Sequence, residues 1–223
     1  MATIRKTSLI TDEIYHVFNR GIDNRLTFEN DTDYLRFYMA SNYYSYSSPP
    51  IRLSAYLLLG DKFKQISHEG NWGEKLVSMM AYCYMPNHFH FLLKQKIDGG
   101  ISKFIGQLLN SYTRYFNVKN NRLGPLFLDD FKNVLIENEN QFTHVSRYIH
   151  LNPYSAGLVK NEKELLDYRW SSLSEYLVTC SNPVCDKSML QSIFKNKDTY
   201  KKFVFANADY QKKLKQVGHL LID

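Results

Sequence analysis

The sequence lacks any apolar run long enough to cross a bilayer, and its first ten residues, MATIRKTSLI, lack the apolar core of a secretory signal. These two absences predict a cytoplasmic protein with no membrane association. Cysteine is also scarce, and Cys83, Cys180 and Cys185 are too widely spaced for a cysteine metal site. We interpret them as free thiols of a reducing compartment. Zinc on Cys83, His88 and His90 would lack a fourth ligand at matching spacing.

Acidic residues are outnumbered by basic ones, which gives a net charge of +6 and a sequence pI of about 9.0. This balance favours an anionic partner, of which nucleic acid is the commonest. The chain also has seventeen tyrosines. Exposed aromatic rings stack on unpaired bases, but the sequence does not separate exposed rings from core ones.

The periodicity of apolar residues predicts an α+β fold. The expected order is strand, helix, strand, strand, helix, strand, which is the ferredoxin-like βαββαβ pattern with an antiparallel sheet. A capping Asp31 or Thr32 favours a helix start there. A further helix follows the last strand and is expected to end at Asn152, because Pro153 disfavours helical geometry before it. The predicted strands are 14–21, 75–85, 88–95 and 126–136. The predicted helices are 31–46, a helix that starts at about 101 and ends near NNRLGP (120–125), and 139–152.

The domain prediction places the ferredoxin-like domain at residues 1–155 and a basic, helical C-terminal extension at 156–223. Residues 51–75 interrupt the pattern and are interpreted as an insertion. Within them, IRLSAYLLLG fits either a strand or a buried turn of helix.

The segment MPNHFHFLL places His88 and His90 two residues apart at the start of a predicted strand. Residues i and i+2 of a strand share one face, so the two imidazoles project side by side. Such a pair binds a metal or contacts a phosphate, and it is equally compatible with a solvated polar face.

Tyr148 and Asn152 are four residues apart and share a face of the helix that follows the sheet. If that helix packs beside His88 and His90, one site holds two imidazoles, an amide oxygen and a phenol. Bound Mg²⁺ or Mn²⁺ would keep its full charge in this neutral set, and a phenol beside a phosphate is a candidate nucleophile. Tyr112 and Tyr115 compete for that role, and Asn152 before a proline also fits a simple helix end.

Several segments together resemble the single-tyrosine, or IS200-like, transposases of the HUH nuclease superfamily, including the REP-associated tyrosine transposases. The resemblance covers most of residues 14 to about 177. The segments that carry it are YHVFNRG, AYCYMPNHFHFLLK, SYTRYFN, SRYIHLNPYSAGL and YRWSSLSEYL.

The resemblance implies a metal-dependent endonuclease and strand transferase that cuts single-stranded DNA beside a hairpin. It implies Tyr148 as the nucleophile that forms a 5′-phosphotyrosine, and His88, His90 and Asn152 as ligands of Mg²⁺ or Mn²⁺. The family contains homodimers that exchange the tyrosine helix and also monomers, and the sequence leaves both open. The alternative is a non-catalytic, nucleic-acid-binding regulator on the same fold.

Overall fold

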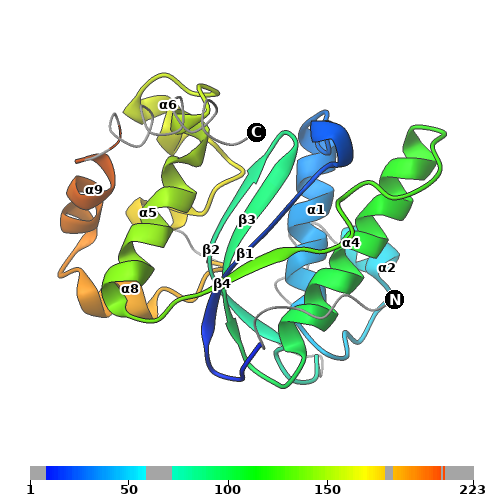
Figure 1. Cartoon of the computed structure of the whole chain (residues 1–223), viewed down its shortest axis with the longest axis horizontal. Coiled ribbons are helices and arrows are strands. Elements are labelled where there is room, and N and C mark those ends of the chain that lie inside the picture. The colour runs from blue at the N-terminus through cyan, green and yellow to red at the C-terminus, as the bar shows by residue number, and fades with distance from the viewer. Residues whose placement is uncertain (1–8, 59–71, 179–182, 207, 209–223) are drawn as a thin grey trace. The chain divides into compact units, whose positions relative to one another are not determined.

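The structure is a computed structural model that describes residues 9–58, 72–178, 183–206 and 208. Strands and helices alternate through the first two thirds of the chain, and short helices follow (Figure 1). The strands are β1 (Ile14–Arg20), β2 (Val77–Met85), β3 (His88–Gln95) and β4 (Lys132–Leu135). The helices are α1 (Asp31–Tyr44), α2 (Leu53–Leu58), α4 (Gly100–Lys119), α5 (Glu139–Ser155), α6 (Glu162–Leu166), α7 (Leu173–Leu177), α8 (Ser188–Ile193) and α9 (Lys197–Phe205), with a 3-10 turn η1 at Ile22–Asn24.

The four strands form one sheet in the order β2–β3–β1–β4. β1 and β4 run antiparallel, with Tyr15 opposite Leu135 and Phe18 opposite Lys132. The predicted α+β fold with a ferredoxin-like order of elements is confirmed. The last strand is shorter than the predicted 126–136, because only Lys132–Leu135 joins the ladder.

The described chain divides into two compact units. Of the described residues, the first contains 9–58, 72–78, 86–88 and 93–135, and the second contains 79–85, 89–92, 136–178, 183–206 and 208. The predicted division at residue 155 stays a prediction. Within the predicted insertion 51–75, Leu53–Leu58 is helix α2, which decides between the two alternatives for that segment. Residues 59–71 lie outside the described part of the chain.

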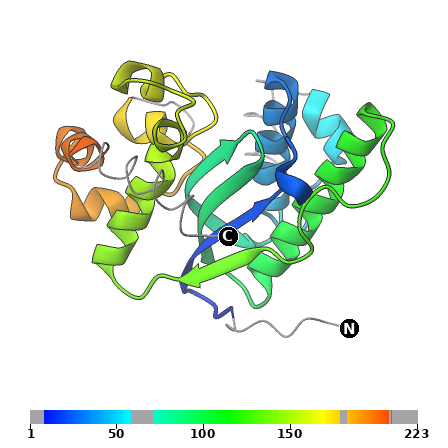
Figure 2. The same ribbon diagram turned by 45° about the horizontal axis from the view of Figure 1, so that its top comes forward.

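In the first unit, α1 and α4 lie side by side (Figures 1 and 2). Aromatic side chains fill the space between them: Phe37 and Tyr112 pack edge to face at 5.1 Å, and both are fully buried. Helix α1 is capped by Asn30, whose side chain accepts from the Asp33 backbone N–H. The predicted cap at Asp31 or Thr32 was therefore wrong by one or two residues, because Asn30 has the extended backbone that a cap requires.

The turn between β2 and β3 is held by the segment after β1. The Gly21 N–H donates to the Asn87 carbonyl at 2.8 Å, and the Thr27 and Phe28 N–H groups donate to the Pro86 carbonyl. A Cβ at Gly21 would lie 2.4 Å from the Arg25 carbonyl oxygen, so only glycine fits this close approach. This contact joins the NRG and MPNH segments in space.

In the second unit, α5 is fixed by a buried polar network. The ring nitrogens of His150 lie 2.7 Å from the Tyr200 hydroxyl of α9 and 2.8 Å from the Ser172 hydroxyl. The Ser172 hydroxyl in turn accepts from the Tyr82 backbone N–H of β2 at 2.9 Å. Helix α5 is thereby tied to β2 and to the C-terminal helices that follow it.

Helix α5 does not end at Asn152, as the sequence analysis expected, but continues through Pro153 to Ser155. Proline lacks the N–H that would donate to the Ile149 carbonyl, and the helix nevertheless continues for two residues beyond it. The Ala156 N–H still bonds to the Asn152 carbonyl, and the chain leaves the helix at Gly157, which has a φ of 73°. Gly157 is therefore the residue that ends the helix.

Candidate active site

Strand β3 carries the predicted histidine pair into the protein. His88 is half-buried at the first position of the strand, and His90 is buried with 5% of its surface exposed. Phe89 and Phe91 alternate with them and are fully buried. The His-x-His spacing thus places the two imidazoles on one face of β3, as predicted.

Helix α5 places Tyr148 beside His90. The two rings meet edge to face with their centres 5.5 Å apart. Asn152 lies one turn further along α5, and its side chain lowers the pKa of the Tyr148 phenol. The structure therefore brings together His90, Tyr148 and Asn152, which are three of the four predicted site residues.

The environment of Tyr148 opposes ionisation of its phenol. Burial raises the pKa of Tyr148, the Asn152 side chain lowers it, and the nearby Cys83 thiol raises it. The side chain is nevertheless 37% exposed, whereas Asn152 is almost fully buried. Tyr148 is thus a neutral phenol that a solvent-borne substrate can reach.

His88 has a defined partner at the β2–β3 turn. The Asn87 Oδ1 atom lies 2.6 Å from the His88 Nδ1 atom, and Asn87 Nδ2 donates to the Asn24 carbonyl oxygen at 3.4 Å. Reversing the amide would set two acceptor oxygens against each other, so Oδ1 faces the imidazole. Because Oδ1 only accepts, Nδ1 carries the proton and Nε2 is the nitrogen with the lone pair.

This arrangement fits a divalent metal. Histidines that bind metals usually donate their other ring N–H to an oxygen acceptor, as His88 does to Asn87. The sequence analysis did not single out Asn87, although its place directly before His88 was the available signal. Among the described residues, no group of three or more His, Cys, Asp or Glu side chains is gathered for a metal. The predicted set contains only two such side chains, so that absence does not bear on it.

The competing tyrosines are committed elsewhere, both in the first unit. The Tyr112 hydroxyl is buried and donates to the Thr27 carbonyl at 2.6 Å, and burial raises its pKa well above the ordinary range. The Tyr115 hydroxyl donates to the Asp33 carboxylate at 2.9 Å, and burial, followed by this bond, raises its pKa. Both hydroxyls serve packing between α1 and α4.

Comparison with known proteins agrees with this geometry. A family model described as "Transposase IS200 like" matches residues 59–152, which include the His-x-His segment, Tyr148 and Asn152. A solved structure of a REP-associated tyrosine transposase bound to a REP hairpin has a TM-score of 0.54 with 16% sequence identity. That likeness covers 82% of this chain and 90% of the other. No curated protein matches the sequence.

The four-stranded sheet and the helices around it share the fold of that solved structure. Residues 59–152 are thus similar in sequence to the IS200-like transposases. In the described part of the chain, no helix is long and apolar enough to span a membrane.

Proposed function

We propose that this protein is an IS200-like transposase that cuts single-stranded DNA next to a hairpin and keeps the cut end as a 5′-phosphotyrosine on Tyr148. The observation that carries the proposal is the contact between the Tyr148 and His90 rings, with Asn152 one turn further along the same helix. Support for the hairpin comes from the similar solved structure, which is bound to a REP hairpin.

The proposed reaction is a single displacement at phosphorus. The Tyr148 oxygen loses its proton and forms a bond to the phosphorus atom, while the bond from phosphorus to the 3′ oxygen breaks. The departing 3′ oxygen takes up a proton. One phosphodiester is exchanged for another, so a 3′ hydroxyl can later reverse the step and join a new strand without an external energy source.

In this proposal His88, His90 and Asn152 hold Mg²⁺ or Mn²⁺, which when bound would polarise the scissile phosphate. Their imidazole and amide donors are neutral, so the site attracts the cation only weakly. His90 also packs against the Tyr148 ring and limits the directions from which a phosphate reaches the phenol. Burial raises the pKa of this phenol, and the Asn152 side chain lowers it.

Peptide mapping of the covalent adduct tests the proposal. Trypsin separates the three candidate tyrosines, because Tyr112 falls in residues 104–114, Tyr115 in 115–119 and Tyr148 in 148–160. The chain is incubated with Mn²⁺ and a single strand that flanks a hairpin, digested with trypsin and nuclease, and analysed by mass spectrometry. We expect the nucleotide mass on Tyr148 within 148–160. DNA binding with no modified peptide would instead favour a non-catalytic regulator.

A further inference from the structure

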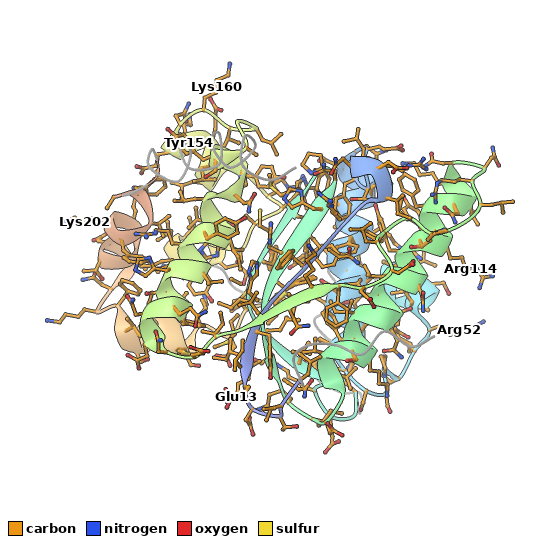
Figure 3. All side chains as sticks on the ribbon, in the orientation of Figure 1. Glu13, Arg52, Arg114, Tyr154, Lys160 and Lys202 are labelled. Atoms are coloured by element: carbon orange, nitrogen blue, oxygen red, sulfur yellow. The ribbon has the colours of Figure 1, made fainter. Side chains whose placement is uncertain are left out.

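The outer surface of α4 carries a second polar site, which is separate in sequence from His90 and Tyr148. Two hollows of about 780 and 720 Å³ lie along this helix, both within the first unit. They share Asn110, Arg114 and Val118, so Arg114 stands where the two hollows meet. Arg114 is exposed and projects from α4 (Figure 3).

The lining of these hollows is basic and otherwise neutral. In the part of the chain that the structure describes, neither lining includes an acidic residue. Cations come from Arg36, Arg114, Lys119 and Arg122, and amide or hydroxyl groups supply most of the remaining polar atoms. Such a mixture of guanidinium, amide and hydroxyl donors is what binds phosphodiester oxygens.

Lys119 is the one cation of the lining that is already neutralised. Its ammonium group lies 2.7 Å from the Asp33 carboxylate and 3.2 Å from Glu29. The carboxylates of Asp33 and Glu29 are therefore already paired with Lys119. The positive charge available to a ligand comes from the arginines.

Arg36 provides the clearest sign of an unfilled site. Its guanidinium lies 5.0 Å from the centre of the Tyr115 ring, and its Nε atom is buried without a hydrogen-bond partner among the described residues. A buried N–H donor without an acceptor is costly. Arg36 also lines the larger hollow, where its other guanidinium N–H groups can donate to an anion. Arg122 spends its donors on neutral acceptors, namely the carbonyls of Gly124 and Pro125 and the Asn117 side chain, so its charge also remains uncompensated.

We infer that the α1–α4 surface formed by Arg36, Arg114 and Arg122 binds the phosphodiester backbone of the DNA substrate. This inference rests on the proposed function and adds a binding surface that lies outside the His90–Tyr148 site in sequence. The bound group is a row of backbone phosphates, which either the hairpin stem or its single-stranded flank supplies. Polar donors without base-edge geometry position a strand rather than read its sequence.

The test is DNA binding by the full chain in a chelator, so that no cleavage occurs. Fluorescence anisotropy is measured with three labelled probes: a hairpin with a single-stranded 5′ flank, the flank alone and the hairpin alone. We expect Arg114→Ala and Arg36→Gln each to weaken binding several-fold, without a preference for sequence. Each should also reduce the log–log salt slope by about 0.7 to 0.9 per lost phosphate contact.

Arg52→Ala is the matched control, since it removes an exposed arginine of the same unit that lines neither hollow. Arg114 is exposed, so its replacement keeps the test valid even if Arg36→Gln unfolds, which a thermal melt detects. Weaker binding of the flank probe or of the hairpin probe supports the inference. The probe that loses affinity shows which part of the DNA contacts the arginines. Wild-type affinity and slope in both variants overturn it and leave the proposed function standing. No binding of any probe by the wild type overturns both.

Discussion

Asn87 orients the ring of His88, one of the histidines of the proposed metal site. Its amide is oriented by the Asn24 carbonyl and accepts from His88 Nδ1, which leaves Nε2 as the basic nitrogen. A solvated neutral histidine favours the opposite form, with the proton on Nε2. Asn87 therefore selects the form of His88 that the proposed metal site needs.

The first prediction is that Asn87→Ala weakens Mn²⁺ binding by about 10- to 100-fold, because the His88 ring loses the acceptor that orients it. Calorimetry measures the affinity, and ¹⁵N spectra of labelled histidine in the metal-free chain report which ring nitrogen carries the proton. Asn24→Gly is the control, since it keeps the carbonyl and tolerates the φ of 55° at this position. An unchanged proton position in Asn87→Ala would show that Asn87 does not orient His88. If Asn87→Ala changes the protonated ring nitrogen of His88 but the wild-type chain binds no Mn²⁺, the proposed metal site is refuted.

At the scale of the helix, α5 depends on one neutral, buried histidine. Burial lowers the pKa of His150 to about 3, against about 6.5 in an unfolded chain. Below pH 6.5 the unfolded chain takes up a proton that the folded chain does not accept until about pH 3. Folding stability is therefore fully present above pH 6.5 and is lost as the pH falls through this window.

We predict that His150 contributes a limiting slope of about 1.4 kcal/mol per pH unit to this loss. Burial also lowers the pKa of His16 to about 4, so this residue adds to the loss in the upper part of the window. Urea unfolding between pH 7 and pH 4.5 measures the effect. His150→Asn should be less stable at pH 7 by about 1–3 kcal/mol, because buried partners lose their hydrogen bonds, yet show a shallower pH dependence. His144→Gln, an exposed change on the same helix, should retain the wild-type slope, and an equally steep slope in His150→Asn would contradict the account.

The elements also show where sequence reasoning holds. Alternation and helical spacing located β3 and α4 closely, because each buries one periodic face. Helix ends were less accurate, since they depend on which group satisfies the last backbone bonds. Gly157, rather than Pro153, ends α5 because only the glycine leaves the helix with a positive φ.

For the whole molecule, sequence motifs anticipated the meeting of His90 with Tyr148, which are 58 positions apart. They did not anticipate Asn87 or the arginines of the α1–α4 surface. Those residues act through side-chain orientation and local charge, which periodicity does not encode. Family resemblance led to the proposed chemistry, while the packing of individual side chains showed the neighbours of the candidate residues.

The measurement that tests the account most directly is covalent capture of DNA by the intact chain. End-labelled single-stranded DNA flanking a hairpin is incubated with Mn²⁺ and run on a denaturing gel, where an adduct migrates slowly and is removed by protease. Tyr148→Phe removes one oxygen and keeps the ring against His90, so folding and DNA binding should survive while the adduct disappears. Tyr112→Phe and Tyr115→Phe should both retain it. An adduct that persists in Tyr148→Phe, and is lost instead in Tyr112→Phe or Tyr115→Phe, would contradict the assignment of the nucleophile to α5.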